Sequence, residues 1–495
     1  MAKLFLFGIG GTGARVIKHF TFLLANGVPL SGIDTVVPIL VDPDKGNGDL
    51  NKTLSIVDLY TRIRNNVDLS QSEFFKVKLS TLYSIAKEMD ANSISTMNED
   101  AFTQKIQGIQ SKKFKDYISL STLTRETQAL CRLLFSDENL ETPLDVGFKG
   151  NPNMGSVVLN QFSQSDFFNF FASSFDRNDK IFIISSIFGG TGSSGFPILL
   201  KNLRNPSESI PKHDYIKNAI IGAITVLPYF NLENDANSKI NSNTFISKAK
   251  AALDYYQHTI IPNKELNILY YVGDNENATY KNAEGGQLQE NRAHFVEFIS
   301  ALSVFDFVEL QGLSTEMGRA SQTFAKEFGL VEDNIHVVHF PHFSHKERKK
   351  IQNPMIQFYF MYRYFEDKLP NAPKSKSPWV QDSKINLGDS SYEDMKKFLS
   401  YYKEWLEEMA GNRIAFKPFK LNEGNKEELF SSIEGIQPPK KGFSLFGSKS
   451  DYEVFEDALN TASKNLSKDI SNFKRFLSLM SVSTSSIIEK KQLNF

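Results

Sequence analysis

Two glycine clusters, each placed between a short apolar run and a helix-like segment, constrain this chain more than any other feature. The first cluster, GIGGTG at 8–13, follows the apolar run Lys3–Phe7. The second, GGTGSSG at 189–195, follows the apolar run Lys180–Ile187. Glycine lets a backbone turn tightly and approach a phosphate, and the helix that follows supplies free N–H groups and partial positive charge. Each cluster therefore predicts an anion-binding loop between a strand and a helix.

Further apolar runs predict the remaining strands of one sheet. They lie at Thr35–Val41, Ala219–Leu227 and Leu266–Val272. Near-continuous apolar runs are typical of strands that are covered on both faces. Helix-like segments at 195–203 and 244–258 lie between them. This order predicts an α/β fold, with a mainly parallel sheet and helices on both faces, followed by a diverged, largely helical C-terminal region.

The length of 495 residues predicts two or three domains. We expect a nucleotide-binding domain at 1–328, with a helical insertion near 51–139 and a central helix near 291–310. A C-terminal α/β or helical domain should follow at 329–434. A linker or long loop at 435–450, GIQPPKKGFSLFGSKS, then leads to C-terminal helices at 451–495.

Composition indicates the cellular compartment and excludes some classes of partner. The formal net charge of −1 gives no signal for nucleic acid or for an anionic membrane. No apolar stretch approaches the roughly 20 residues that span a bilayer. The single cysteine, Cys131, cannot form an internal disulfide, which suits a reducing cytosol. We therefore expect a cytoplasmic protein.

The first glycine cluster alone does not identify the ligand. It also satisfies the G-x-G-x-x-G pattern of dinucleotide-binding proteins. An NAD(P)-dependent oxidoreductase would use Asp42, after the second strand, to bind the ribose. In that alternative the second cluster has no role.

A third loop, GFKGNPNMG at 147–155, completes a recognisable order of motifs. The three loops resemble, in sequence order, those of the tubulin/FtsZ superfamily, and the chain looks like a divergent bacterial member. Ser194 and Phe188 depart from the family pattern, which has a glycine and a small residue there. The resemblance implies that GTP or GDP phosphates contact Gly10, Gly11, Thr12, Gly13, Gly150, Asn151, Gly189, Gly190, Thr191, Gly192 and Ser193.

The same resemblance implies how the rest of the nucleotide is bound. Asn275, in YVGDNE at 271–276, matches the asparagine that binds the guanine edge, and an amide offers both donor and acceptor. Asn291 matches a second base-binding position. Asp42 and Asp44 fall in the second loop, where acidic residues hold Mg²⁺ beside the phosphates; a turn with solvated acids is the equal alternative.

Hydrolysis and assembly are separate expectations. Polymerising members carry an acidic loop after the central helix that completes the neighbouring subunit's active site. That motif is not recognisable here. Asp306, Glu309 and Glu316 are the acidic residues that could act in catalysis, but their spacing does not match the motif. The resemblance implies head-to-tail oligomers or filaments. The alternative is a non-hydrolysing scaffold that recruits partner proteins through its C-terminal region. Division, plasmid partition, cytoskeletal and defence roles all fit.

Four histidines recur at three-residue intervals, which raises the possibility of a zinc site. They are His336, His339, His342 and His345. The run IHVVHF at 335–340 predicts a strand, in which positions three apart point to opposite faces. Local hydrogen bonding or contact with a partner is therefore the favoured interpretation.

Overall fold

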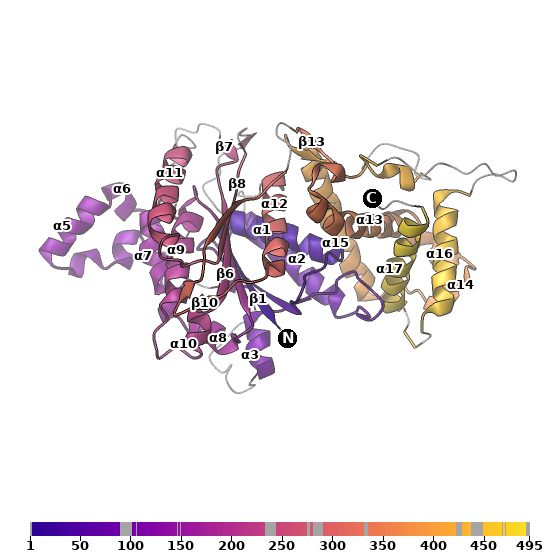
Figure 1. Cartoon of the computed structure of the whole chain (residues 1–495), viewed down its shortest axis with the longest axis horizontal. Helices are drawn as coiled ribbons and strands as arrows, with labels where there is room; N and C mark the ends of the chain where they lie inside the picture. The colour runs from indigo at the N-terminus through magenta and orange to yellow at the C-terminus, as the bar shows by residue number, and fades with distance from the viewer. Residues whose placement is uncertain are drawn as a thin grey trace.

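An eight-stranded parallel sheet forms the centre of the protein (Figure 1). The computed structural model describes residues 2–89, 101–104, 106–145, 147–148, 150–232, 244–274, 278–280, 291–330, 335–421, 428–436, 449–467, 469–470 and 472–491. The strand order is β12 (Phe324–Glu327), β8 (Ile268–Val272), β6 (Ile220–Val226), β5 (Lys180–Ser186), β1 (Lys3–Ile9), β2 (Thr35–Val41) and β3 (Lys78–Leu79), with β4 (Thr103–Gln104) also paired to β2.

Every ladder in this sheet is parallel, so the carboxyl ends of the strands meet at one edge. β1 lies inside the sheet, between β5 and β2, and is buried at every position from Leu4 to Ile9. Both glycine clusters follow central strands, β1 and β5, which are direct neighbours. The sheet therefore brings two loops that are far apart in the sequence to the same edge.

Helices cover both faces of the sheet, as predicted. One face carries α1 (Gly10–Ala25), α2 (Gly48–Arg64) and α12 (Phe295–Glu309). The other carries α7 (Pro152–Leu159), α8 (Asp166–Ser174), α9 (Gly190–Arg204) and α11 (Phe245–Tyr255). α12 is buried from Phe295 to Val308, as expected for a helix that is apolar all round.

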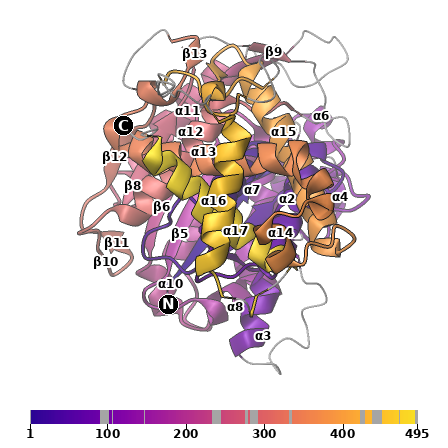
Figure 2. The same cartoon turned by 90° about the vertical axis from the view of Figure 1, so that its right-hand side faces the viewer.

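The C-terminal region is largely helical and packs beyond α1 and α2 (Figures 1 and 2). Its main helices are α13 (His345–Asp367), α14 (Pro378–Ser383), α15 (Ser390–Ala410), α16 (Asp451–Asn465) and α17 (Asn472–Lys490). Two short strands, β13 (Val337–Val338) and β14 (Ala415–Phe416), pair in parallel. The predicted fold class is confirmed: an α/β layer with a parallel sheet, then a helical region.

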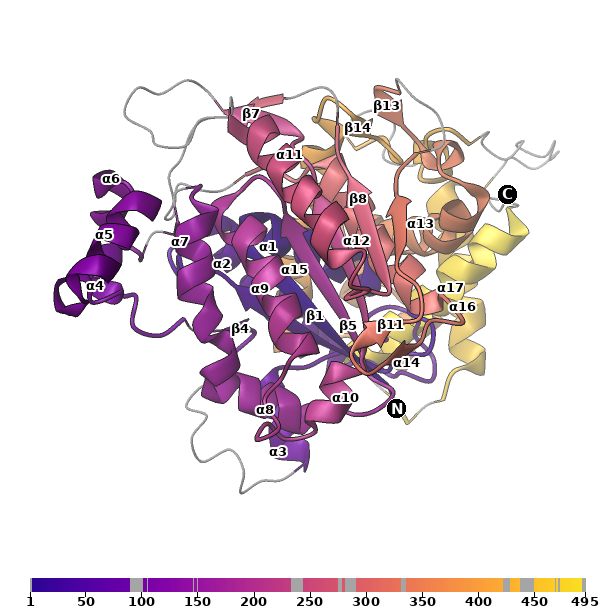
Figure 3. The same ribbon diagram turned by 60° about the vertical axis from the view of Figure 1, so that its left-hand side comes forward.

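A small arm projects from the body on the side of α7 (Figure 3). It contains α4 (Phe114–Tyr117), α5 (Arg125–Leu134) and α6 (Asp137–Leu140). The chain enters and leaves the arm through paired backbone: Phe114 N–H donates to Thr142 O at 2.9 Å, and Leu144 N–H donates to Lys112 O at 3.0 Å.

Two further small strand pairs lie outside the main sheet. The strands β10 (Thr315–Glu316) and β11 (Arg319–Ala320) form a tight hairpin after α12. The short strands β7 (Phe230–Leu232) and β9 (Ala278–Tyr280) pair in parallel. Among the described residues, no helix is both long enough and apolar enough to cross a membrane.

Candidate functional site

Three glycine loops converge at the carboxyl edge of the sheet. A methyl group built on Gly10 would lie 3.5 Å from Cβ of Thr191 and 3.6 Å from the backbone N of Gly192. One built on Gly190 would lie 3.0 Å from the backbone N of Gly150. The first separation is an ordinary van der Waals contact and the second is tighter than one, so the three loops lie directly beside one another.

Each of these loops leads into the N-terminus of a helix. α1 begins at Gly10, α9 begins at Gly190, and α7 begins one residue after its N-cap, Asn151. None of the three helices has an acidic residue in its first turn. Acidic side chains commonly balance the positive end of a helix. Three positive helix ends are therefore directed at one place without a carboxylate of their own.

Close packing of glycines holds the first loop against the sheet. A methyl group on Gly13 would lie 2.5 Å from the carbonyl carbon of Gly8 and 3.1 Å from Ile184 O. Gly10 has a φ of 72°, in the left-handed region that favours glycine. These positions require glycine because the backbone of α1 rests directly on β1 and β5.

A cation adds to the positive character of the site. Lys248 of α11 donates from Nζ to Gly150 O at 2.7 Å. Burial lowers the pKa of Lys248 from its ordinary value. A bound anion beside it would favour the charged ammonium form.

The hydroxyl groups of the loops are engaged locally. Thr12 Oγ1 accepts a hydrogen bond from Arg15 Nη2 at 3.3 Å. Ser193 donates to Gly189 O, and Ser194 donates to Gly190 O at 2.7 Å. Asn151 Oδ1 caps α7 by accepting from the N–H groups of Asn153 and Met154. Thr191 lies against Gly10, where its side chain borders the space between the first two loops.

The acidic loop after β2 borders the same region. Asp42 Oδ1 accepts from the Asp44 N–H at 3.0 Å, and Asp44 Oδ1 accepts from the Gly46 N–H at 2.9 Å. Further along, Asn47 and Asp49 approach Gly11, with 3.7 Å from a methyl group built there to either side chain. Burial raises the pKa of Asp42 to about 7, and the nearby charges of Asp44 and Asp49 add to this.

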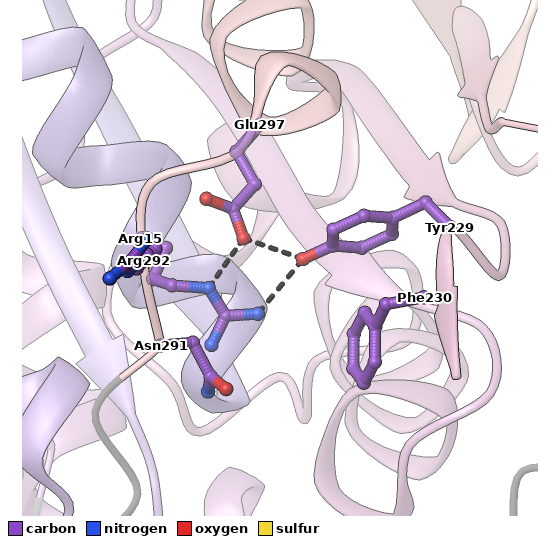
Figure 4. A pocket seen from close by; sticks show the side chains of 6 residues that line it. All are labelled: Arg15, Tyr229, Phe230, Asn291, Arg292 and Glu297. Carbon is purple, nitrogen blue, oxygen red and sulfur yellow. Dashed lines mark hydrogen bonds and ion pairs between the residues drawn. The ribbon is translucent and has the colours of Figure 1, made fainter. Parts of the chain in front are cut away.

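A pocket beside the loops is built around a buried arginine (Figure 4). Arg15 of α1 pairs through Nε with Glu297 of α12, and through Nη1 with Asp49 of α2 at 2.5 Å. Tyr229, in the loop after β6, accepts from Arg15 Nη2 at 2.9 Å and donates to Glu297 at 2.5 Å. The lining residues are Arg15, Tyr229, Phe230, Asn291, Arg292 and Glu297.

Charge pairing dominates the ionisation of this network. Burial opposes the ionised form of Glu297, yet the charge of Arg15 holds the pKa of Glu297 at about 2. Burial, opposed mainly by the charge of Glu297, lowers the pKa of the neighbouring His19 to about 3. At neutral pH, Glu297 is therefore a carboxylate and His19 is neutral.

The sequence offers two base-binding candidates, Asn275 and Asn291. Asn275 lies outside the described residues. Asn291 lines the pocket and donates from Nδ2 to Asp49 Oδ2 at 2.9 Å. It does not begin α12, because that helix starts four residues later, after the N-cap His294.

The three acidic candidates lie away from the loops. The first turn of α12, which contains Glu297, lies beside the pocket, and the helix runs toward the amino ends of the strands, where Phe307 contacts Gly222. Asp306 is buried there and is paired with Lys346 at 2.5 Å and Lys326 at 3.0 Å. Glu309 pairs with Lys350 at 2.8 Å, and Glu316 is exposed in the β10–β11 hairpin.

The histidine series forms local contacts. Only Val337–Val338 of the run predicted as a strand is extended and paired. His339 bonds through Nδ1 to Lys417 O, and its N–H donates to His342 Nδ1 at 2.9 Å. Within the described part of the chain, no group of three or more potential metal ligands is found.

Several residues of this site did not stand out in the sequence. They are Arg15, Asp49, Tyr229, Lys248, Arg292 and Glu297. One signal was present for the central pair: Arg15 and Glu297 are ionisable residues inside mostly apolar helices, and such residues need a partner when buried. Nothing comparable marks Lys248 in the sequence.

Comparisons with known proteins give structural matches alone. No protein-family model matches the chain, and no curated protein matches it by sequence. A GTPγS-bound protofilament of CetZ2 from Haloferax volcanii aligns with 62% of this chain and 58% of its own, at 12% identity and a TM-score of 0.29. CetZ from Methanosaeta thermophila aligns with 55% of this chain and 46% of its own, at 16% identity and a TM-score of 0.26.

A third match is a GTPγS-form protofilament of TubZ from Bacillus thuringiensis serovar israelensis, which covers 55% of this chain and 45% of its own, at 11% identity and a TM-score of 0.25. The chain thus spans about half the length of the proteins that it matches. All three belong to the tubulin/FtsZ superfamily, the family that the glycine loops resemble. Scores this low assign no residue roles, so the function proposed below depends on the geometry of the loops.

Proposed function

We propose that this protein binds a purine nucleoside triphosphate, GTP, with its phosphates across the three glycine loops. The convergence of Gly10, Gly150 and Gly190 carries the proposal, because three positive helix ends without acidic side chains suit a polyphosphate. Gly10–Gly13, Gly150, Asn151 and Gly189–Ser193 contact the phosphates. Lys248 adds a compensating charge.

The position of the phosphates also indicates where the base and the metal ion would bind. The base lies against the outer rim of the pocket, beside Asn291, because Arg15, Tyr229 and Glu297 fill its interior. Asn275 is the further candidate. Asp42 and Asp44 hold Mg²⁺ beside the phosphates. The raised pKa of Asp42 fits this role, because a divalent cation would stabilise a carboxylate that burial otherwise disfavours.

The proposal is tested by nucleotide titration of the full chain. Gly190→Ala places a methyl group 3.0 Å from the backbone of Gly150, so it forces the loops apart. We expect GTP affinity to fall by about tenfold or more in calorimetry, because a misplaced loop loses charge-assisted hydrogen bonds.

Gly329→Ala is the matched control, because a methyl group there meets no atom within 4 Å. Titration with ATP and NAD identifies the ligand, and mass spectrometry identifies any nucleotide that is purified with the protein. A preference for NAD would replace this proposal with the oxidoreductase alternative.

We also propose that copies associate head to tail. The glycine loops lie at one end of the sheet, and the β10–β11 hairpin lies at the other, where Asn267, just before β8, bonds to Ser314 and Thr315. Met317 at the hairpin tip is 81% exposed, and Phe324 nearby is 44% exposed. Exposed apolar residues at this end suit contact with another protein surface.

Light scattering with and without GTP tests association. We expect GTP-dependent assembly in the wild type and its loss in Met317→Glu, with nucleotide binding unchanged. A monodisperse monomer under both conditions would reject the assembly.

Turnover is proposed to be slow. Asp306 is already neutralised by two lysines, which argues against its acting as a base toward a neighbouring subunit. A GTP turnover assay at several protein concentrations, repeated with Thr191→Ala, separates a slow GTPase from a scaffold. Turnover that rises steeply with protein concentration would point to catalysis between subunits.

A further inference from the structure

The segment Asn291–His294 lies between the pocket and the C-terminal helix α15. Three carboxylates from three different helices each accept one of its backbone N–H groups. Asp49 of α2 accepts from Asn291 at 2.9 Å, and Glu408 of α15 accepts from Ala293 at 2.8 Å. Glu297 of α12 accepts from His294 at 3.1 Å. An extended segment is thereby fixed without belonging to any helix or strand.

α15 and the residue that follows its C-cap, Asn412, hold both backbone groups of Ala293. Glu408 accepts its N–H, and Asn412 Nδ2 donates to its carbonyl oxygen. Asn412 Nδ2 also donates to Glu408 O at 3.0 Å, which links the two contacts. Ala293 itself is fully buried. The far wall of the pocket is therefore attached to the C-terminal region.

Two lysines of the nucleotide-binding face hold Glu408 in place. Lys52 of α2 lies 3.5 Å from Glu408 Oε1, and Lys18 of α1 lies 4.0 Å from Glu408 Oε2. The Lys18 side chain is only 3% exposed, so its charge needs a partner. Glu404, one turn earlier, pairs with Lys52 at 2.9 Å but has no bond to the segment.

The held segment presents two side chains to the pocket. Asn291 uses its Nδ2 on Asp49, which leaves its Oδ1 as an acceptor. Arg292 lines the pocket, is exposed, and makes no hydrogen bond or ion pair within the described part of the chain. A guanidinium fork matches the adjacent O6 and N7 acceptors of guanine, whereas adenine places a donor at N6.

We propose that Glu408 is a positioning residue of the nucleotide site: through Ala293 it sets Asn291 and Arg292 against the purine base, and Arg292 selects guanine. The inference rests on the proposed nucleotide function. It makes α15 a part of the binding site, although α15 contributes no group to the phosphate loops.

Two probes separate positioning of the base from general damage. GTP uses both the loops and the pocket, whereas inorganic tripolyphosphate uses only the loops. In calorimetry on the full chain, Glu408→Gln is expected to weaken GTP binding about tenfold and to leave tripolyphosphate binding unchanged. Glu404→Gln, the matched control on the same helix, is expected to change neither. Arg292→Gln should reduce the preference for GTP over ATP.

Asn412→Ala provides a second variant that keeps Lys18 and Lys52 paired, in case Glu408→Gln unfolds. It should likewise weaken GTP binding and spare tripolyphosphate. Equal losses for both probes, or identical behaviour of the Glu408 and Glu404 variants, would overturn the positioning role. If the wild type binds no GTP, the proposed function fails. The positioning of Ala293 by Glu408 is then judged by amide hydrogen exchange: faster exchange at Ala293 in Glu408→Gln but not in Glu404→Gln supports it, and unchanged exchange rejects it.

Discussion

Glu297 is the residue on which the buried charge network depends. It accepts from the Arg15 guanidinium and from the Tyr229 hydroxyl, and its side chain is 1% exposed. A buried ion pair is costly to break, because removing one partner leaves a desolvated charge. The network therefore links α1, α12 and the loop after β6 at the base of the pocket.

Glu297→Gln should lower stability and change its pH dependence. The folded pKa of about 2 lies below the ordinary 4.5, so the unfolded chain binds the proton first as the pH falls. The carboxylate thus contributes about 3 kcal/mol above pH 4.5, and this is lost between pH 4.5 and 2. Urea unfolding across this range measures it.

In the glutamine variant that part of the acid dependence should be missing, and stability at pH 7 should be lower by a similar amount. Glu404→Gln, which removes a carboxylate whose side chain is 46% exposed, serves as the control. Parallel pH profiles for wild type and Glu297→Gln would show that the network does not contribute to stability.

At the scale of single elements, α5 differs from the other helices of the protein. Leu133 is 82% exposed and Leu130 is 53% exposed, and none of the ten residues of α5 is buried. The arm is instead held by Phe114 and Phe135, whose rings meet edge to face at 4.8 Å. α5 thus covers a very small core, which Phe114 and Phe135 form.

Leu133→Gln should change the unfolding free energy by less than about 0.5 kcal/mol, because exposed substitutions have little effect. Phe135→Ala, at the buried side of the same arm, should cost about 3 kcal/mol of local stability. Hydrogen exchange across 112–144 compares them. Strong deprotection by Leu133→Gln would mean that this leucine is covered in solution.

The elements that the sequence predicted well are those with one dominant signal. β2 was predicted at Thr35–Val41 and occupies those residues, because its apolar run ends at an aspartate. The run at 335–340 gave only two strand residues, because His339 caps a short 3-10 turn that begins at Phe340. The meeting of the glycine loops at 8–13, 147–155 and 189–195 depends on the order of strands in the sheet. No single segment of the sequence encodes that order.

Contacts between distant segments were the least predictable feature. The pairing of Arg15 with Glu297, and of Glu408 with Ala293, joins residues more than a hundred positions apart. Ionisable residues in apolar helices indicated that partners exist, but they did not identify them. The glycine loops could be predicted from the sequence because the residues that form each loop are adjacent in the chain.

The whole molecule is organised around the contact between α15 and the first two helices. Phe22 of α1 stacks on Trp405 at 5.1 Å, and Tyr402 donates to Asn26 Oδ1 at 3.0 Å. Phe22 is fully buried by this packing. The C-terminal region therefore completes the hydrophobic core on one face of the α/β layer.

A chain that ends at residue 328 should not fold into a stable monomer. It would expose Phe22, His19 and the buried Lys18 to water, and large exposed apolar patches promote association. Size-exclusion chromatography with circular dichroism measures the outcome. A monomeric fragment with cooperative unfolding would show that residues 1–328 form an independent domain.

The paired backbone at the neck of the arm has a consequence for how this chain can vary. Because Lys112 and Leu144 are hydrogen-bonded neighbours, the polypeptide departs from the α/β layer and returns to it at one spot. Everything between them can be shortened, enlarged or exchanged for an unrelated module without rerouting a strand. The neck is accordingly the place where a fluorescent reporter could be inserted, or where related chains would differ most in length.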